Sequence, residues 1–132
     1  MIEPTYALQV AMTAALKAGQ GVGAPLFDRV PVTTPDPYVS LGDHQFVPAA
    51  ADCLDRLGAV HSTLHVFSTA YGSKEARAIA GAIIDRLDHA VLDLGPDWGA
   101  IEIAFTGSRI VPEPDGKTSH VVITFTTLLD PA

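Results

Sequence analysis

Three histidines are the residues whose type and spacing come closest to a site for metal or acid–base chemistry. His61 and His65 form an H-x3-H pair, and His120 follows near the end of the chain. On a helix, such a pair places both rings on one side at metal-binding distance. Residues 59–69 are instead rich in β-branched and aromatic side chains, a composition that predicts a strand.

That strand keeps the two histidines of the pair apart. Four residues at ~3.3 Å each separate the Cα atoms of His61 and His65 by roughly 13 Å, too far for one ion. The glutamate that follows the first histidine in zinc proteases is also missing after His61. We therefore expect the rings to lie on a sheet face or at a subunit contact, and not to bind a metal together.

The other patterns that resemble reactive sites are incomplete. Gly19, Gly21 and Gly23 follow a predicted helix, whereas a phosphate-binding loop needs a strand before its glycines and a helix directly after them. No serine lies in a G-x-S-x-G elbow, and Cys53 has aspartates nearby that disfavour its thiolate. The acidic residues are scattered and form no tuned pair. We expect no catalytic, cofactor-binding or metal-binding residue.

Composition predicts one folded, soluble domain spanning residues 1–132, because 48% of the residues are hydrophobic and 17% are charged. The net charge is −7, from 15 acidic and 8 basic residues. A surface that grips nucleic acid needs clustered Lys and Arg, so this balance argues against one. It suits a protein that DNA passes without being held.

Cysteine content and hydropathy indicate the cellular compartment in which the protein is made. A single cysteine allows no internal disulfide and no cysteine-based metal cluster, which fits synthesis in the reducing cytoplasm. The sequence starts without a basic segment followed by an apolar run, and it has no stretch of ~18 apolar residues. We expect neither export nor contact with a membrane.

Two segments have the apolar periodicity of helices. Apolar residues recur at helical spacing between residues 5 and 17, and the glycines from Gly19 onward should end this helix. A second helix should start after Ser73, whose hydroxyl oxygen is expected to accept an amide proton of the first turn. Its apolar stripe consists of Ala76, Ile79, Ala80, Ile83, Ile84 and Leu87.

Extended segments account for most of the remaining sequence. We predict a short extended piece at residues 26–30 and, after a proline-rich connection, strands at residues 38–41 and 59–69. Residues 101–106 alternate as in a strand that buries Ile101, Ile103 and Phe105, and a further run reaches Val111. The turn at residues 112–116 should join it to an antiparallel strand at residues 119–128, with Val121, Ile123 and Phe125 on one face.

Residues 42–58 have poor periodicity and are predicted to be an inserted loop, with a short helix at residues 49–57 as one option. The order of elements indicates an α+β domain in which two helices pack on one face of a mainly antiparallel sheet. Such a sheet has an edge without an obvious blocking proline, a feature suited to assembly. Five aromatic residues are equally consistent with interface anchors and with ordinary core: Tyr38, Phe46, Phe67, Tyr71 and Trp98.

Over nearly its whole length the sequence resembles the phage tail-completion family, which includes tail terminators of long-tailed phages and of gene transfer agents. The resemblance lies in the order and spacing of several signals. They are the alanine-rich first helix ending in glycines, residues 26–31, 37–42 and 64–68, Gly72 with the helix containing Glu75, Ala76, Ile79 and Ala80, and the turn at residues 114–120. The sequence departs from the family in residues 45–57, where relatives vary in length.

The resemblance implies a virion structural protein and not an enzyme. By this resemblance, the chain is expected to form a homo-oligomeric ring, usually a hexamer in this family. The ring ends the tail tube and docks onto the head-completion or stopper ring. DNA passes through the channel of this ring at the head–tail junction, and the family has no catalytic residues to carry over. The alternative from another class is a small-ligand-binding module or an enzyme subunit that uses His61, His65 or His120.

Overall fold

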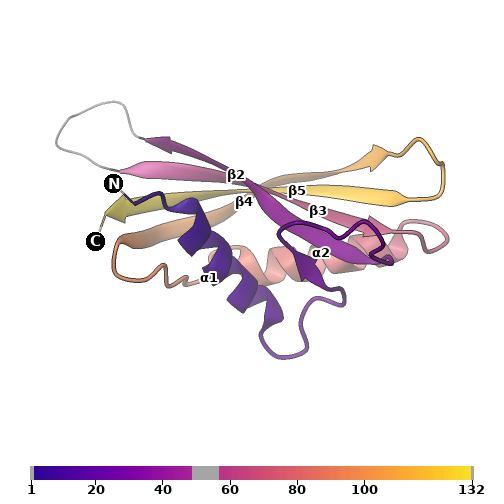
Figure 1. The fold of residues 1–132 in the computed structure, drawn as a ribbon, viewed down its shortest axis with the longest axis horizontal. Coiled ribbons are helices and arrows are strands. Elements are labelled where there is room, and N and C mark those ends of the chain that lie inside the picture. The colour runs from indigo at the N-terminus through magenta and orange to yellow at the C-terminus, as the bar shows by residue number, and fades with distance from the viewer. Residues whose placement is uncertain (1, 49–56, 132) are drawn as a thin grey trace.

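The chain folds as a sheet with helices on one side (Figure 1). The computed structural model describes residues 2–48 and 57–131, and within them the elements are α1 (Thr5–Lys17), β1 (Leu26–Phe27), β2 (Tyr38–Pro48), β3 (Gly58–Ser68), α2 (Lys74–Leu87), β4 (Trp98–Pro112) and β5 (Ser119–Pro131). The strand order is β1-β2-β3-β5-β4, with β1 parallel to β2 and the other neighbours antiparallel. The predicted α+β class with a mainly antiparallel sheet is confirmed.

The core lies between the helices and the inner face of the sheet. Alternate residues of β3 and β5 point toward the helices, as the period of two in a strand requires. The predicted inner positions of β5 and five of the six residues of the predicted α2 stripe are buried there: Ala76, Ile79, Ala80, Ile83, Leu87, Val121, Ile123 and Phe125. Ile84, the sixth residue of the stripe, is only half-buried. From α1, Leu8, Met12 and Leu16 are buried against the same core.

The first helix ends where the sequence predicts. Gly19, Gly21 and Gly23 all have positive φ angles, which glycine adopts without a steric penalty. The Arg86 guanidinium of α2 donates hydrogen bonds to the carbonyl oxygens of Ala15 and Ala18, at 3.3 and 2.6 Å. One basic side chain thus satisfies carbonyl groups at the C-terminal end of α1 and ties the two helices together.

The start of the second helix differs from the prediction in one contact. Ser73 is the N-cap residue of α2, but its hydroxyl makes no capping hydrogen bond to a backbone amide. Its oxygen instead accepts a hydrogen bond from Nε of Arg77 at 2.9 Å. Arg77, one turn along the helix, competes with the backbone amides as a donor to the Ser73 hydroxyl. The sequence pattern of an N-cap does not include such a side-chain donor.

The prediction of a loop at residues 42–58 is wrong for residues 42–48, because β2 continues to Pro48. A register shift between Ser40 and Asp43 interrupts the alternation on this strand, which accounts for its poor apolar periodicity. Gly42 lies at this irregularity, where an added Cβ would come 2.8 Å from the carbonyl oxygen of Asp28. The optional helix at residues 49–57 falls almost entirely outside the described residues.

The prediction that Ile101 is buried with Ile103 and Phe105 is also wrong. Ile101 is 56% exposed, whereas Ile103 is buried. In the pairing of β4 with β5, Ala100 lies opposite Leu129 and Glu102 opposite Leu128, so Ile101 is an extra residue. A β-bulge at this position turns the isoleucine side chain away from the core.

Candidate functional site

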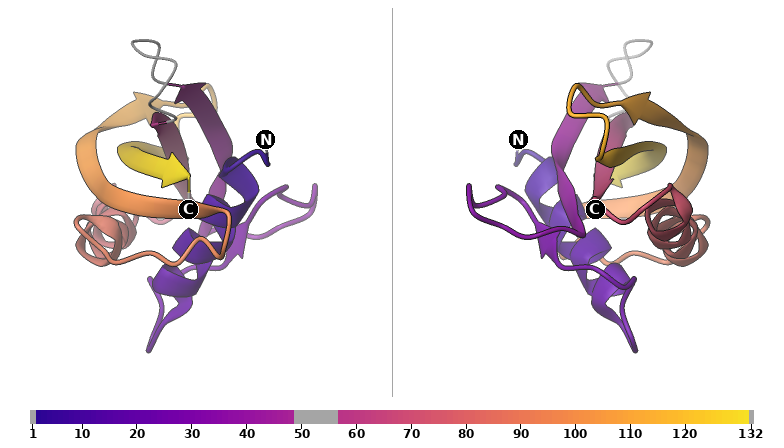
Figure 2. Two further views of the ribbon diagram at one scale, coloured as in Figure 1. Left: turned by 90° about the vertical axis from the view of Figure 1, so that its left-hand side faces the viewer. Right: turned by 90° about the vertical axis from the view of Figure 1, so that its right-hand side faces the viewer.

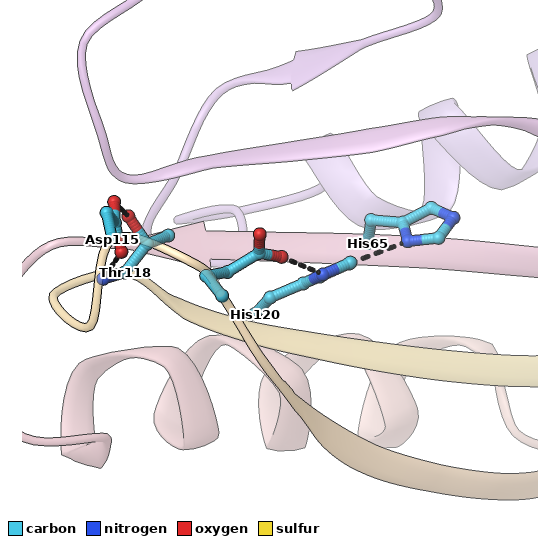
Figure 3. Close-up of polar contacts among 5 residues, drawn as sticks. His65, Asp115, Thr118 and His120 are labelled. Carbon is cyan, nitrogen blue, oxygen red and sulfur yellow. Dashed lines mark hydrogen bonds and ion pairs between the residues drawn. The ribbon is translucent and has the colours of Figure 1, made fainter.

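His65 and His120 come together on the sheet face opposite the helices. In the β3–β5 pairing, Phe67 lies opposite His120 and His65 opposite Val122, so the two histidines are diagonal neighbours. Nδ1 of His65 lies 2.8 Å from Nε2 of His120 (Figure 3). The side chains are 26% and 13% exposed, so this contact is largely shielded from solvent.

Carboxylates lie at both ends of the histidine pair. Glu113, from the turn between β4 and β5, places Oε1 2.6 Å from Nδ1 of His120. Asp43 of β2 places Oδ2 3.7 Å from Nε2 of His65. A carboxylate accepts hydrogen bonds only, so Nδ1 of His120 is the donor to Glu113. Side chains from four segments therefore form one polar row, Asp43–His65–His120–Glu113.

The 2.8 Å contact between the two rings holds a single proton. When at least one ring is neutral, one of the two facing nitrogens carries a proton and the other accepts it in a normal hydrogen bond. If both rings were imidazolium ions, both facing nitrogens would carry protons and would repel each other. Burial lowers the pKa of His65, the positive charge of a protonated His120 lowers it further, and Asp43 acts in the opposite direction. Double protonation is thus incompatible with this geometry.

Aromatic rings continue from the histidine pair across the sheet. Tyr38, Phe67 and His120 lie opposite one another in register on β2, β3 and β5. Ring centroids are 5.0 Å apart for Tyr38–Phe67 and 4.3 Å apart for Phe67–His120, and both pairs are stacked. These cross-strand contacts fix the rotamer of His120 and help to position its Nε2 atom.

His61 is separate from this cluster. Its Nδ1 atom lies 3.1 Å from the hydroxyl oxygen of Thr126, and its side chain is exposed. Both members of the H-x3-H pair lie on β3, as the sequence predicts. In residues 2–48 and 57–131, no group of three or more His, Cys, Asp or Glu side chains is placed to hold a metal ion. Cys53 lies outside the described residues.

Sequence reasoning missed His44, which connects α1 to the sheet. Its Nε2 atom lies 3.0 Å from Oε1 of Gln9 and its Nδ1 atom 2.8 Å from the hydroxyl of Ser62. A neutral ring that donates to Gln9 and accepts from Ser62 satisfies both contacts. Burial lowers the pKa of His44. Because its partners lie 35 and 18 residues away, no local pattern reveals this role.

The five candidate interface aromatics fall into three groups. Trp98 is 4% exposed, packs edge-to-face on Phe46, and donates its indole N–H to the carbonyl oxygen of Ile2, so it belongs to the core. Tyr38 and Phe67 are half-buried in the aromatic row. Tyr71 is fully exposed after β3. No helix in the described part of the chain is long and apolar enough to cross a membrane.

Comparisons with known proteins agree with this architecture. No curated protein matches the sequence. A solved chain from a structure described as the virion of a native gene transfer agent (GTA) particle superposes with a TM-score of 0.86 at 21% identity, covering 98% of this chain and 99% of that one. The likeness shows that the two chains share a fold.

The sequence itself matches the profile of the family described as tail completion protein gp17 over residues 10–130. The match extends from Val10 in α1 to Asp130 in β5 and includes the histidine cluster. The predicted resemblance is confirmed, and the chain belongs to the tail completion protein gp17 family of structural proteins of phage-like virion tails.

Proposed function

We propose that this chain is one subunit of a ring, hexameric in the assembled particle, at the head–tail junction of a phage-like virion. The ring ends the tail tube, joins it to the head-completion or stopper ring, and leaves a channel for DNA. The observation that carries this proposal is the family match over residues 10–130. The superposition on a chain of a gene transfer agent virion supports it at the level of the fold.

The charge distribution supports a channel that does not hold DNA. A duplex is held by clustered basic side chains that release counterions, and this chain has a net charge of −7. Part of its basic charge is engaged within the fold, since the Arg86 guanidinium donates hydrogen bonds to carbonyl groups of α1. We expect the channel wall to be neutral or acidic.

The alternative function, ligand binding or catalysis by His61, His65 or His120, has one observation in its favour. The His65–His120 pair with its two carboxylates resembles a proton relay. The facing nitrogens, however, already bond each other. Two surface hollows along β4 are lined by residues of β4, β5 and α2, and none of the three histidines lines either hollow. A structural role for the pair fits these contacts better.

Deletion of the gene in a particle-producing strain tests the proposal. Electron microscopy should show tails that are unattached or of uncontrolled length, and the wild-type gene supplied in trans should restore them. Normal attached tails in the deletion strain would refute the role. The alternative predicts a saturable small ligand or a tightly bound metal, which isothermal titration would detect.

A second experiment tests the channel. The purified ring at micromolar concentration should not retard linear duplex DNA at ~150 mM salt, where non-specific binders commonly have dissociation constants of roughly 10⁻⁴ to 10⁻⁶ M. Tight, salt-sensitive retardation by the ring would contradict a non-binding channel wall.

A further inference from the structure

A groove runs between helix α2 and the edge strand β4. The helix lines it with Arg77, Gly81 and Ile84, and the strand lines it with Arg109 and Ile110. Its volume of about 350 Å³ lies within the range of sites that bind small groups, roughly 300–1,000 Å³. β4 is the last strand of the sheet, and no strand among the described residues pairs with it on this side. The groove therefore joins an apolar floor to an open strand edge.

Gly81 is the residue of this groove that the fold itself does not explain. It lies inside α2, where glycine destabilises a helix relative to alanine. Its φ is not positive, in contrast to Gly72 and Gly95 on either side of the helix. A Cβ added at Gly81 would meet no described atom of the chain within 4 Å. The open space beside Gly81 leaves room for a side chain of another molecule to contact the backbone of α2.

Two arginines give the groove a positive rim. Arg77 and Arg109 are exposed, and neither forms an ion pair with a carboxylate among residues 2–48 and 57–131. The bond from Nε of Arg77 to Ser73 fixes the side chain and leaves its terminal nitrogens free to donate. An apolar floor with a cationic rim fits a partner with an apolar anchor on an acidic surface.

A second copy of this chain has those properties. Its net charge is −7. The connection between β1 and β2 contains the turn Pro31–Thr34, in which the amide and hydroxyl of Thr34 both donate to the carbonyl oxygen of Pro31, at 3.1 and 2.8 Å. Val32 at the tip of this turn is 102% exposed. Asp28 and Asp36 flank the turn, against one basic residue, Arg29.

The turn and the groove lie on opposite sides of the subunit. β1 and β4 are the two outer strands of the sheet. Both views in Figure 2 place the connection between β1 and β2 on one side of the molecule and α2 on the other. Two different patches on opposite sides can join copies head to tail, and contacts of this kind generate rings when the rotation closes. The prolines limit the freedom that the turn loses on binding.

We propose that the turn Pro31–Thr34 of one copy inserts Val32 into the α2–β4 groove of the next copy, between Arg77 and Arg109. This contact rests on the proposed ring and assigns the surfaces that join its subunits. The valine contacts the floor at Gly81, Ile84 and Ile110. Asp28 and Asp36, on either side of the turn, bring negative charge to the contact with the two guanidinium groups.

Two variants with matched controls test the contact. Gly81→Met fills the groove with a residue that favours helix, and Ala78→Met places the same side chain on an exposed part of α2 outside the groove. Val32→Ser removes the anchor, and Val91→Ser changes another fully exposed valine. The two test variants should weaken subunit association at least about tenfold, as loss of a central anchor does, while the controls assemble as wild type. Thermal melts should show all four folded.

Mixing the two test variants separates a head-to-tail contact from any other defect. The Gly81→Met chain retains its valine and the Val32→Ser chain retains its open groove, so one contact per pair is restored. Native mass spectrometry should show a one-to-one heterodimer of twice the 13.8 kDa of one chain, and no larger assembly. Absence of the heterodimer, or rings formed by either variant alone at wild-type concentrations, overturns the proposed contact.

Complementation of the deletion strain distinguishes failure of this contact from failure of the proposed function. If both test variants restore attached tails as well as wild type, the groove contact is wrong and the ring function stands. If the deletion strain has normal tails, the ring function fails, and the contact fails with it. Loss of complementation by the test variants alone, with both controls active, supports the contact.

Discussion

His65 and His120 share one hydrogen bond of 2.8 Å between ring nitrogens, with a carboxylate beside each outer nitrogen. This arrangement links β2, β3, β5 and the β4–β5 turn through side chains, on the face of the sheet that the helices leave open. The link tolerates one positive charge, because Asp43 and Glu113 offset it. It does not tolerate two, since both facing nitrogens would then be donors.

We predict that the pair makes the stability of the protein depend on pH below neutrality. The pKa of His65 is lowered from its ordinary value of 6.5, first by burial and then by His120. The unfolded chain therefore binds a proton more readily than the folded chain as the pH falls through 6.5. The free energy of unfolding should decrease from pH 6.5 down to the lowered pKa of the folded state, as urea melts between pH 5 and 8 will show.

His65→Gln should reduce this dependence without abolishing it, because the pKa of His44 is lowered in the same direction by burial. His61→Gln is the control, since His61 is exposed and lies outside the pair. If His65→Gln melts with the same slope against pH as wild type, the pair does not contribute to the pH dependence.

The buried bond between His44 and Ser62 leads to a second prediction. Ser62 is 1% exposed and its hydroxyl contacts Nδ1 of His44 at 2.8 Å. Ser62→Ala leaves that nitrogen buried without a partner, which should lower the free energy of unfolding by about 1–3 kcal/mol. Ser40→Ala, on the open face of the neighbouring strand, should change it by less than ~0.5 kcal/mol. Equal effects in denaturant melts would show that the His44 contact is dispensable.

Local periodicity was sufficient to predict the helices and the hairpin. The stripe through Ile79 and Ile83 and the alternation through Val121 and Ile123 each repeat without interruption, and both lie where predicted. Periodicity failed at the register shifts, near Gly42 and at Ile101, because one inserted residue reverses which face the following side chains occupy. Such shifts depend on the partner strand, which local sequence does not specify.

The candidate site was predicted in part for a related reason. His65 and His120 were both singled out, but their meeting depends on the β3–β5 register, 55 residues apart in sequence. Asp43 and Glu113 are two of the scattered acidic residues for which the sequence predicts no special role, because only the fold places them at the two ends of the pair. The spacing of His61 and His65 did correctly predict that the strand holds these rings apart.

The bulge in β4 gives a third prediction, which compares two isoleucines. Ile83→Ala removes a side chain that is fully buried between α2 and the sheet, so transfer and cavity terms should together cost about 2–5 kcal/mol. Ile101→Ala should cost less than ~0.5 kcal/mol, because the bulge exposes that side chain. Denaturant melts of both variants decide the point. A large loss for Ile101→Ala would mean that the alternation continues unbroken through β4.

The turn between β4 and β5 gives the last prediction, on the acidity of Asp115 (Figure 3). Oδ1 of Asp115 accepts hydrogen bonds from the amides of Lys117 and Thr118 at 2.8 and 2.9 Å, and Oδ2 accepts one from the Thr118 hydroxyl at 2.6 Å. The hydroxyl contributes most to lowering the pKa of this carboxyl group from 3.8 to about 2. These bonds favour the charged form, so their contribution to stability is present above pH 3.8 and is lost as the pH falls toward 2.

Thr118→Val removes the hydroxyl and keeps the shape of the side chain and both amide donors. The pKa of Asp115 should therefore rise in the variant and remain below 3.8, because the amide bonds persist. NMR titration of the carboxyl carbon measures this directly. Thr106→Val is the control, because the Thr106 hydroxyl bonds Thr124 elsewhere on the sheet and should not affect Asp115. A pKa near 3.8 in the wild-type protein, or one that does not change in Thr118→Val, would show that the Thr118 hydroxyl does not hold this turn closed.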